Sequence, residues 1–242
     1  MNLLVFDIWG PYAHFKKYYA TTSALTYGIP PKTSLYGFIG AILGLPKSEN
    51  AYLRYFSHKS CIMGLQLQRP LKTCRIGVNL RPNTGRYKDN PKPTLIELVQ
   101  APCYRVFFHH RDEALQARLK TALQEHTCAF TPSLGLANLL ADFAWVGECR
   151  AVHETSGQSA GICSAIPRKQ FLKFDDPEKM KDVDIIEQTM FAIEMDTERS
   201  VTERDDILFE RSVFDLQGNV KPIHATVTHF YKTADYGNLC LF

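Results

Sequence analysis

The sequence lacks the short motifs that mark the best-known catalytic and metal sites. It contains no G-x-x-x-x-G-K-[ST] phosphate loop, no G-x-G-x-x-G dinucleotide motif and no H-E-x-x-H zinc motif. None of its seven cysteines forms a C-x-x-C pair, which argues against a cysteine zinc site. Asp205-Asp206 is a lone acidic pair, of the kind usually found in solvated turns or caps. We therefore expect neither a cofactor nor a metal.

Long apolar runs are also absent. The longest apolar block, residues 35–45, is shorter than the roughly 20 residues that a bilayer-spanning helix requires. The number of cysteines is odd, and no secretory signal peptide precedes them. These features predict a cytoplasmic protein with reduced thiols and no membrane association.

The net charge of +3 is unevenly distributed along the chain. Residues 1–110 carry 14 Lys and Arg against four Asp and Glu, whereas residues 111–242 carry 14 against 21. Such an asymmetry favours a polyanionic partner for the first half. The alternative is that the two halves of the chain simply attract each other.

Acidic residues are missing altogether from residues 10–33, which we call the basic segment. It contains three lysines, five Phe or Tyr residues and a cluster of hydroxyl side chains. Cations neutralise phosphates and aromatic rings stack on bases, so this composition favours RNA. The candidate RNA-binding residues in and just after it are His14, Lys16, Lys17, Tyr18, Tyr19, Thr21, Thr22, Ser23, Tyr27, Lys32, Thr33 and Tyr36.

A second basic stretch covers residues 69–92 and carries seven cations against one acid, Asp89. Its Arg, Lys, Asn, Pro and Gly residues predict an extended hairpin over residues 72–94. The mutual repulsion of these cations favours a nearby polyanion, although a solvated, mobile hairpin would also tolerate it. The candidate RNA-binding residues here are Arg69, Lys72, Arg75, Arg81, Arg86 and Lys88.

Hydrophobic periodicity predicts an α+β fold. Strands are expected at residues 3–9, 58–71, 103–110 and 143–152, and helices at 35–45 and 111–126, the first capped by Thr33 or Ser34. The order is that of a ferredoxin-like, RNA-recognition-motif-like βαββαβ domain, which we place at residues 1–155. After a small-residue linker near residues 156–165, short alternating runs predict a small β-rich C-terminal portion, residues 156–242.

Three blocks of the sequence resemble a known family. GPYAHFKKYYATTSALTYGIPPKTSLYGFIGAILGL, TLIELVQAPCYRVFFHH and PSLGLANLLADFAWVGE are similar to landmarks of the CRISPR-associated Cas-five family of the RAMP superfamily. The similarity is greatest to its subtype I-B branch, and it spans most of residues 1–150. Members of this family cap the 5′ handle of the guide RNA (crRNA) in type I Cascade complexes.

The resemblance implies a set of partners. The hairpin at residues 72–94 would be the thumb that reaches over the guide, and the handle would lie against the basic segment. The neighbours would be the Cascade backbone subunits and the large subunit, with target DNA nearby. Guide pairing, rather than this chain, would read the sequence of the target.

Catalysis is the rival expectation. One branch of the family is a metal-independent ribonuclease that uses Tyr, Lys and His, and Tyr36, His109 and His110 are the candidates here. Phe108 occupies the position directly before the histidine pair, where that branch has lysine. We therefore expect a non-catalytic RNA-binding subunit, with a precursor-crRNA endoribonuclease and an adaptor that touches no RNA as alternatives.

Overall fold

A four-stranded antiparallel sheet forms the centre of the molecule. The computed structural model describes residues 1–242 except residues 21–23, 81–91, 156, 158, 176 and 216–217. The sheet contains β1 (Asn2–Trp9), β5 (Cys61–Leu67), β8 (Cys103–His110) and β9 (Asp142–Arg150), in the order β5-β8-β1-β9. The predicted α+β class is confirmed, and β8 has the limits expected from its sequence.

Two helices connect these strands, α1 (Lys32–Leu43) after β1 and α2 (Glu113–Gln124) after β8. Asp112 caps α2 because its Oδ1 accepts hydrogen bonds from the backbone N–H groups of Ala114 and Leu115, at 2.9 and 3.2 Å. The expected Thr33 or Ser34 cap of α1 is wrong. That helix begins directly after Pro31, whose carbonyl accepts the first backbone bonds without any side-chain cap.

Both faces of the sheet are buried over much of their area. On the helix side, Leu4, Phe6 and Ile8 of β1 join the main hydrophobic cluster. On the opposite side, Leu3 and Val5 pack in a second cluster with residues from the end of the chain. The backbone of Phe242 also exchanges two 2.8 Å hydrogen bonds with Met63, so the end of the chain lies along the outer edge of β5.

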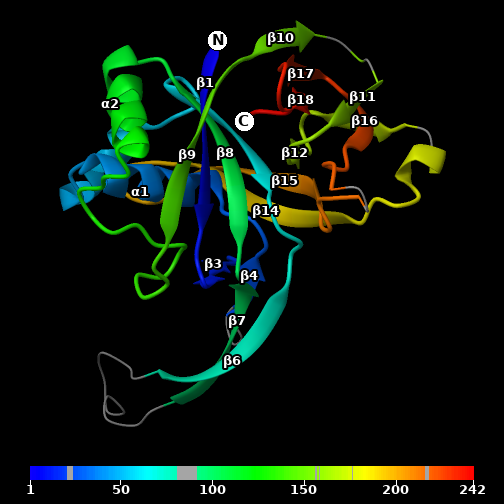
Figure 1. The fold of residues 1–242 in the computed structure, drawn as a ribbon. Coiled ribbons are helices and arrows are strands. Elements are labelled where there is room, and N and C mark those ends of the chain that lie inside the picture. Colours follow the sequence, from blue (N-terminus) through cyan, green and yellow to red (C-terminus); the bar gives the residue numbers. More distant parts are fainter. Residues whose placement is uncertain (21–23, 81–91, 156, 158, 176, 216–217) are drawn as a thin grey trace.

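A long hairpin extends from the sheet, as Figure 1 shows. Its strands are β6 (Thr73–Leu80) and β7 (Lys92–Gln100), and the residues that join them lie outside the described part of the chain. β2 (Tyr12–Ala13) pairs with the base of β7, while β3 (Phe15–Lys16) pairs with β4 (Thr26–Tyr27). The described residues of the basic segment therefore include the short strands β2, β3 and β4.

The second half of the chain is rich in strands. β14 (Ile185–Met195) and β15 (Val201–Glu210) form a long hairpin, which β12 (Ile166–Pro167) joins at the edge. A six-stranded sheet has the order β10-β17-β18-β11-β16-β13. Its strands are β10 (Val152–Thr155), β11 (Ser159–Ile162), β13 (Phe171–Phe174), β16 (Ile223–Val227), β17 (His229–Lys232) and β18 (Asn238–Leu239). The 3-10 helices are η1 (Ser48–Tyr55) and η2 (Pro177–Met180).

The hairpin β14–β15 belongs to the main core. Phe191, Ile193, Ile207 and Phe209 lie in the same hydrophobic cluster as Leu35 of α1. The division into residues 1–155 and 156–242 stays a prediction about folding units, because side chains from both sides of it share this cluster. Among the described residues, no helix is both long enough and apolar enough to cross a membrane.

Candidate nucleic-acid interface

The exposed part of the basic segment is the turn after β3. Lys16 is exposed, and the side chains of Tyr18 and Tyr19 are 52% and 46% exposed. The Lys17 ammonium lies 5.8 Å from the centre of the Tyr27 ring and 6.0 Å from that of Tyr19. This turn therefore presents cations and aromatic rings together, the combination that binds single-stranded nucleic acid.

A cation from a distant strand completes this cluster. Arg204 of β15 places its guanidinium 4.7 Å from the centre of the Tyr18 ring, a cation–π contact. The ring of Tyr27 below is buried, and its hydroxyl donates to the backbone carbonyls of Thr189 and Met190, both at 3.0 Å. Burial raises the pKa of Tyr27 to about 12. Tyr27 therefore anchors the turn to β14 rather than contacting solvent.

Four predicted contact residues lie inside the protein: His14, Tyr27, Lys32 and Tyr36. The ring nitrogen Nδ1 of His14 lies 2.7 Å from the backbone oxygen of Glu97, a residue of β7. In this structure these side chains are buried away from the surface, and their assignment as direct RNA contacts stays a prediction. They support the exposed turn from below.

Lys32 is fully buried and belongs to a charged network between α1 and the hairpin β14–β15. Its ammonium lies 3.7 Å from Oε1 of Glu194 and 3.2 Å from Nδ1 of His58. The hydroxyl of Tyr36 donates to the same Glu194 oxygen at 3.0 Å, and His58 Nε2 lies 2.8 Å from Oε2 of Glu203. Burial lowers the pKa of Lys32 and raises that of Tyr36, while Glu194 favours the charged lysine. The charge of Lys32 is thus compensated within the fold.

The thumb hairpin presents its described cations to solvent. Arg69, Lys72 and Arg75 are exposed, and the last lies opposite Glu97 in the β6–β7 ladder. The Glu97 carboxylate accepts a 3.1 Å hydrogen bond from the backbone of Thr26, so it is engaged with the basic segment. Thr21, Thr22, Ser23, Arg81, Arg86 and Lys88 lie outside the described residues.

A groove runs from this turn along α1. Its first hollow, about 190 Å³, is lined by Lys16, Tyr18 and Arg204 among others. The second hollow, about 290 Å³, shares Thr33 with the first and Arg199 with a third hollow of about 470 Å³. The shared lining residues show that the three hollows adjoin one another, from Lys16 of β3 to Leu45 just after α1.

The candidate catalytic residues do not come together. The rings of Tyr36 and His110 both pack on Phe56, which stacks on the tyrosine at 5.0 Å and meets the histidine edge-on at 6.1 Å between ring centres. His110 accepts from the backbone N–H of Asp112 and so donates through Nε2 to the Tyr55 carbonyl, at 2.8 Å. His109 is partly exposed on the other face of β8.

Comparison with protein families identifies the chain. The sequence profile described as CRISPR-associated protein (Cas_Cas5) matches residues 3–212. The protein belongs to the Cas-five family. The family resemblance noted in the sequence is therefore confirmed, and it extends through β15 and the end of the hairpin β14–β15.

Among solved structures, one CRISPR protein shares the fold of this Cas-five protein over nearly its whole length. A CRISPR protein from Archaeoglobus fulgidus is 11% identical and has a TM-score of 0.56 over 99% of this chain and 98% of that chain. A chain of a CRISPR RNA-guided surveillance complex is 13% identical, with a TM-score of 0.48 over 93% and 91%. A chain of the Type III-B Cmr-beta complex bound to cognate target RNA and AMPPnP is 12% identical, with 0.48 over 86% and 84%. No curated protein matches the sequence.

Several residues that line the groove of this Cas-five protein could not be found from the sequence. Arg204 and Arg199 lie in the half of the chain with a net negative charge, where single cations carry no distinguishing pattern. Phe130 lies in a loop and follows no periodicity. The groove becomes visible only when the hairpin β14–β15 packs on α1.

Proposed function

We propose that this protein is a non-catalytic crRNA-binding subunit of a type I CRISPR Cascade surveillance complex, most similar to subtype I-B. Its role is to cap the 5′ handle of the guide and to join the backbone subunits to the large subunit for RNA-guided DNA targeting. The observation that carries this proposal is the cluster of Lys16, Tyr18, Tyr19 and Arg204 at the mouth of the groove. Exposed cations beside stacking rings bind the sugar-phosphate backbone and the bases of single strands.

The arrangement of the sheet supports the RNA-binding assignment. The order β5-β8-β1-β9, with α1 and α2 among the connections, supports our proposal of a ferredoxin-like βαββαβ arrangement. RNA-recognition modules of this type usually stack bases on the open face of the sheet. Here the end of the chain covers Leu3 and Val5 on that face, so we place the RNA along the β3 turn and α1 instead.

The shape of the molecule supports the proposed partners. The thumb hairpin projects away from the body in Figure 1 and carries Lys72 and Arg75 on its surface. A projecting basic hairpin suits a position over the guide beside a backbone subunit. The large subunit and the target DNA would then lie near the handle, with the sequence read by base pairing.

The deciding experiment is the purification of the tagged chain with whatever accompanies it. We expect nuclease-protected RNA of uniform length, identified by sequencing, together with other CRISPR-associated subunits identified by mass spectrometry. Co-purification of protein partners without RNA would instead favour the adaptor hypothesis. The same sample would give the sequence of the handle and the stoichiometry of the complex.

The alternative function is a metal-independent endoribonuclease that matures precursor crRNA. The observation in its favour is a hollow of about 570 Å³ in which His109 lies near Arg111 and Lys120. The test is incubation of the purified protein with repeat RNA in EDTA. We expect the RNA to stay intact. Cleavage by the wild type that disappears in His109→Ala would favour the endoribonuclease over the non-catalytic RNA-binding subunit.

A further inference from the structure

The third hollow of the groove, which we call the end pocket, differs from the rest of the interface. It lies beside the C-terminal half of α1, whose small residues form its floor, and its walls include Lys47, Asn50, Tyr52, Phe130 and Arg199. Its volume of about 470 Å³ lies in the range of roughly 300–1,000 Å³ that is typical of ligand pockets. None of the described residues that line it is an Asp or a Glu.

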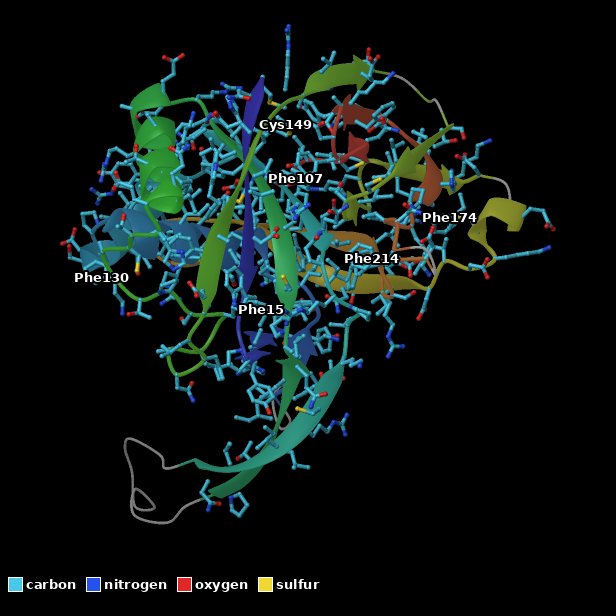
Figure 2. All side chains as sticks on the ribbon, viewed as in Figure 1. Phe15, Phe107, Phe130, Cys149, Phe174 and Phe214 are labelled. Carbon is cyan, nitrogen blue, oxygen red and sulfur yellow. The ribbon has the colours of Figure 1, made fainter. Side chains whose placement is uncertain are left out.

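The backbone of Phe130 is hydrogen-bonded to the end of α1, although its side chain is largely exposed to solvent. The backbone N–H groups of Ala129 and Phe130 donate to the carbonyls of Ile42 and Ala41, each at 3.0 Å, and so satisfy free carbonyl groups at the end of α1. The side chain is nevertheless 61% exposed, and Figure 2 shows it at the outer edge of the molecule beside α1. An anchored, exposed ring is suited to stack on a planar ligand.

Arg199, which also lines the end pocket, lies on a tight turn. The Asp196 carboxylate accepts hydrogen bonds from the backbone of Glu198 and Ser200, at 3.0 and 2.8 Å, and holds the turn between β14 and β15. Within this turn Arg199 adopts a φ of 65°, in the left-handed region that residues other than glycine rarely occupy. Asn50 donates to the Thr197 carbonyl at 3.0 Å and ties the turn to η1.

The cations of the end pocket have no acidic partners within the part of the chain that the structure describes. Neither Lys47 nor Arg199 forms an ion pair there, whereas nearby Arg54 pairs with Glu49. Two cations without an ion pair therefore line the same hollow as an exposed aromatic ring. Beside Gly37 the surface of α1 is open, because an added Cβ there would meet nothing within 4 Å, whereas a Cβ on Gly40 would lie 3.6 Å from Tyr52.

We propose that the end pocket binds a single nucleotide of the RNA, with its base stacked on Phe130 and its phosphate held between Lys47 and Arg199. This inference rests on the proposed function and adds to it a base-binding site distant from the β3 turn. The combination of a ring platform with two cations fits a nucleotide better than an acidic peptide, which would use the cations but leave the ring exposed.

Photochemical crosslinking tests the position of the base. The full chain is bound to single-stranded RNA that contains 4-thiouridine, irradiated and digested, and the modified peptides are identified by mass spectrometry. We expect crosslinks at Phe130 or Tyr52. Crosslinks confined to the basic segment would overturn the end pocket and leave RNA binding intact, whereas a chain that binds no RNA would overturn both.

Matched variants test the energetics in a binding titration with the same RNA. Phe130→Ala should weaken binding about tenfold, while Phe130→Tyr should bind as the wild type does, since base–aromatic stacking carries the effect. Leu140→Ala is the control, because Leu140 is 56% exposed but does not line the pocket. Arg199→Ala should weaken binding severalfold, with Arg54→Ala as its control. Equal affinities for all of these variants would overturn the proposal.

Discussion

The basic segment and the thumb hairpin carry similar excesses of positive charge, but the fold uses them differently. In the basic segment Lys32 is fully buried against Glu194, and only the turn after β3 offers its cations to solvent. In the thumb hairpin Lys72 and Arg75 are exposed on a projecting ladder. The basic segment is therefore packed against the rest of the fold, whereas the thumb hairpin projects away from it.

The difference shows that a local count of charges does not reveal which charges are compensated. The partner of Lys32 lies in β14, far along the chain, so no window of sequence around the lysine contains it. The hypothesis that the two halves attract each other describes this lysine well. Lys16, Lys72 and Arg75 form no ion pair within the described residues, and they are among the cations left for a polyanion.

The largest expected effect comes from changing Lys32, the buried lysine of the basic segment, and it is an effect on stability. Lys32→Ala removes one partner of a buried charge network, and such changes cost about 3–5 kcal/mol in the free energy of unfolding. Urea titration followed by circular dichroism measures it. Lys32→Met combined with Glu194→Gln should recover much of the loss, because it removes both charges together. A loss below about 1 kcal/mol for Lys32→Ala would show that the network contributes little.

The next effect concerns the exposed turn. Lys16→Glu combined with Lys17→Glu should weaken RNA binding about tenfold and make its salt dependence shallower. With about 0.7 per phosphate contact on single strands, the slope of log K against log salt should fall by about 1.4. Filter binding over a salt series measures both quantities. Unchanged affinity and slope would remove the β3 turn from the interface.

A single cation of the thumb hairpin should have a smaller effect. Arg75→Ala is expected to weaken RNA binding by about threefold and to lower the salt slope by about 0.7, because one phosphate contact is lost. Its free energy of unfolding should change by no more than about 0.5 kcal/mol, as for other exposed sites. A large loss of stability would mean that Arg75 stabilises the fold, contrary to the description of the thumb hairpin as a projecting arm with exposed cations.

The smallest effect lies at the exposed edge of the Lys32 network. Hydrogen bonding from Lys169, with a further contribution from His58, lowers the pKa of Glu203 below its ordinary value of 4.5. A lowered carboxylate pKa stabilises the fold above the unfolded value, and this contribution is lost as the pH falls through the folded value. Lys169→Ala should therefore reduce the loss of stability on acidification, measured as the midpoint of urea unfolding between pH 6 and about pH 3. Identical pH profiles for the wild type and Lys169→Ala would show that the interaction of Lys169 with Glu203 does not contribute measurably to stability.

Much of the first half of the fold could be predicted from local patterns. Alternation defines β8, and Leu115, Leu119 and Leu123 give α2 its buried face, since both signals depend on neighbouring residues only. The predicted linker was wrong in part, because Ser159–Ile162 forms β11 within a sheet. Small residues are needed there: a Cβ on Gly161 would lie 3.0 Å from the Cβ of Pro222.

The candidate site was predictable only for its exposed turn. Lys16, Tyr18 and Tyr19 were found from composition, and their role stays a prediction. Composition could not separate them from His14 and Lys32, because burial is decided by β7 and β14, which pack on the segment from elsewhere in the chain. The two-residue strands β3 and β4 are too short to produce a periodic signal.

The seating of Phe242 along β5 has a consequence for behaviour at high concentration. Exposed strand edges are templates for pairing between copies, and the hydrogen bonds between Phe242 and Met63 occupy part of this one. At the other end of the sheet, the ladder between β1 and β9 is interrupted by a bulge beside Val146, which disfavours a regular new partner. We therefore expect copies of the isolated chain to resist edge-to-edge aggregation, and to meet one another through side chains rather than through an extended backbone ladder.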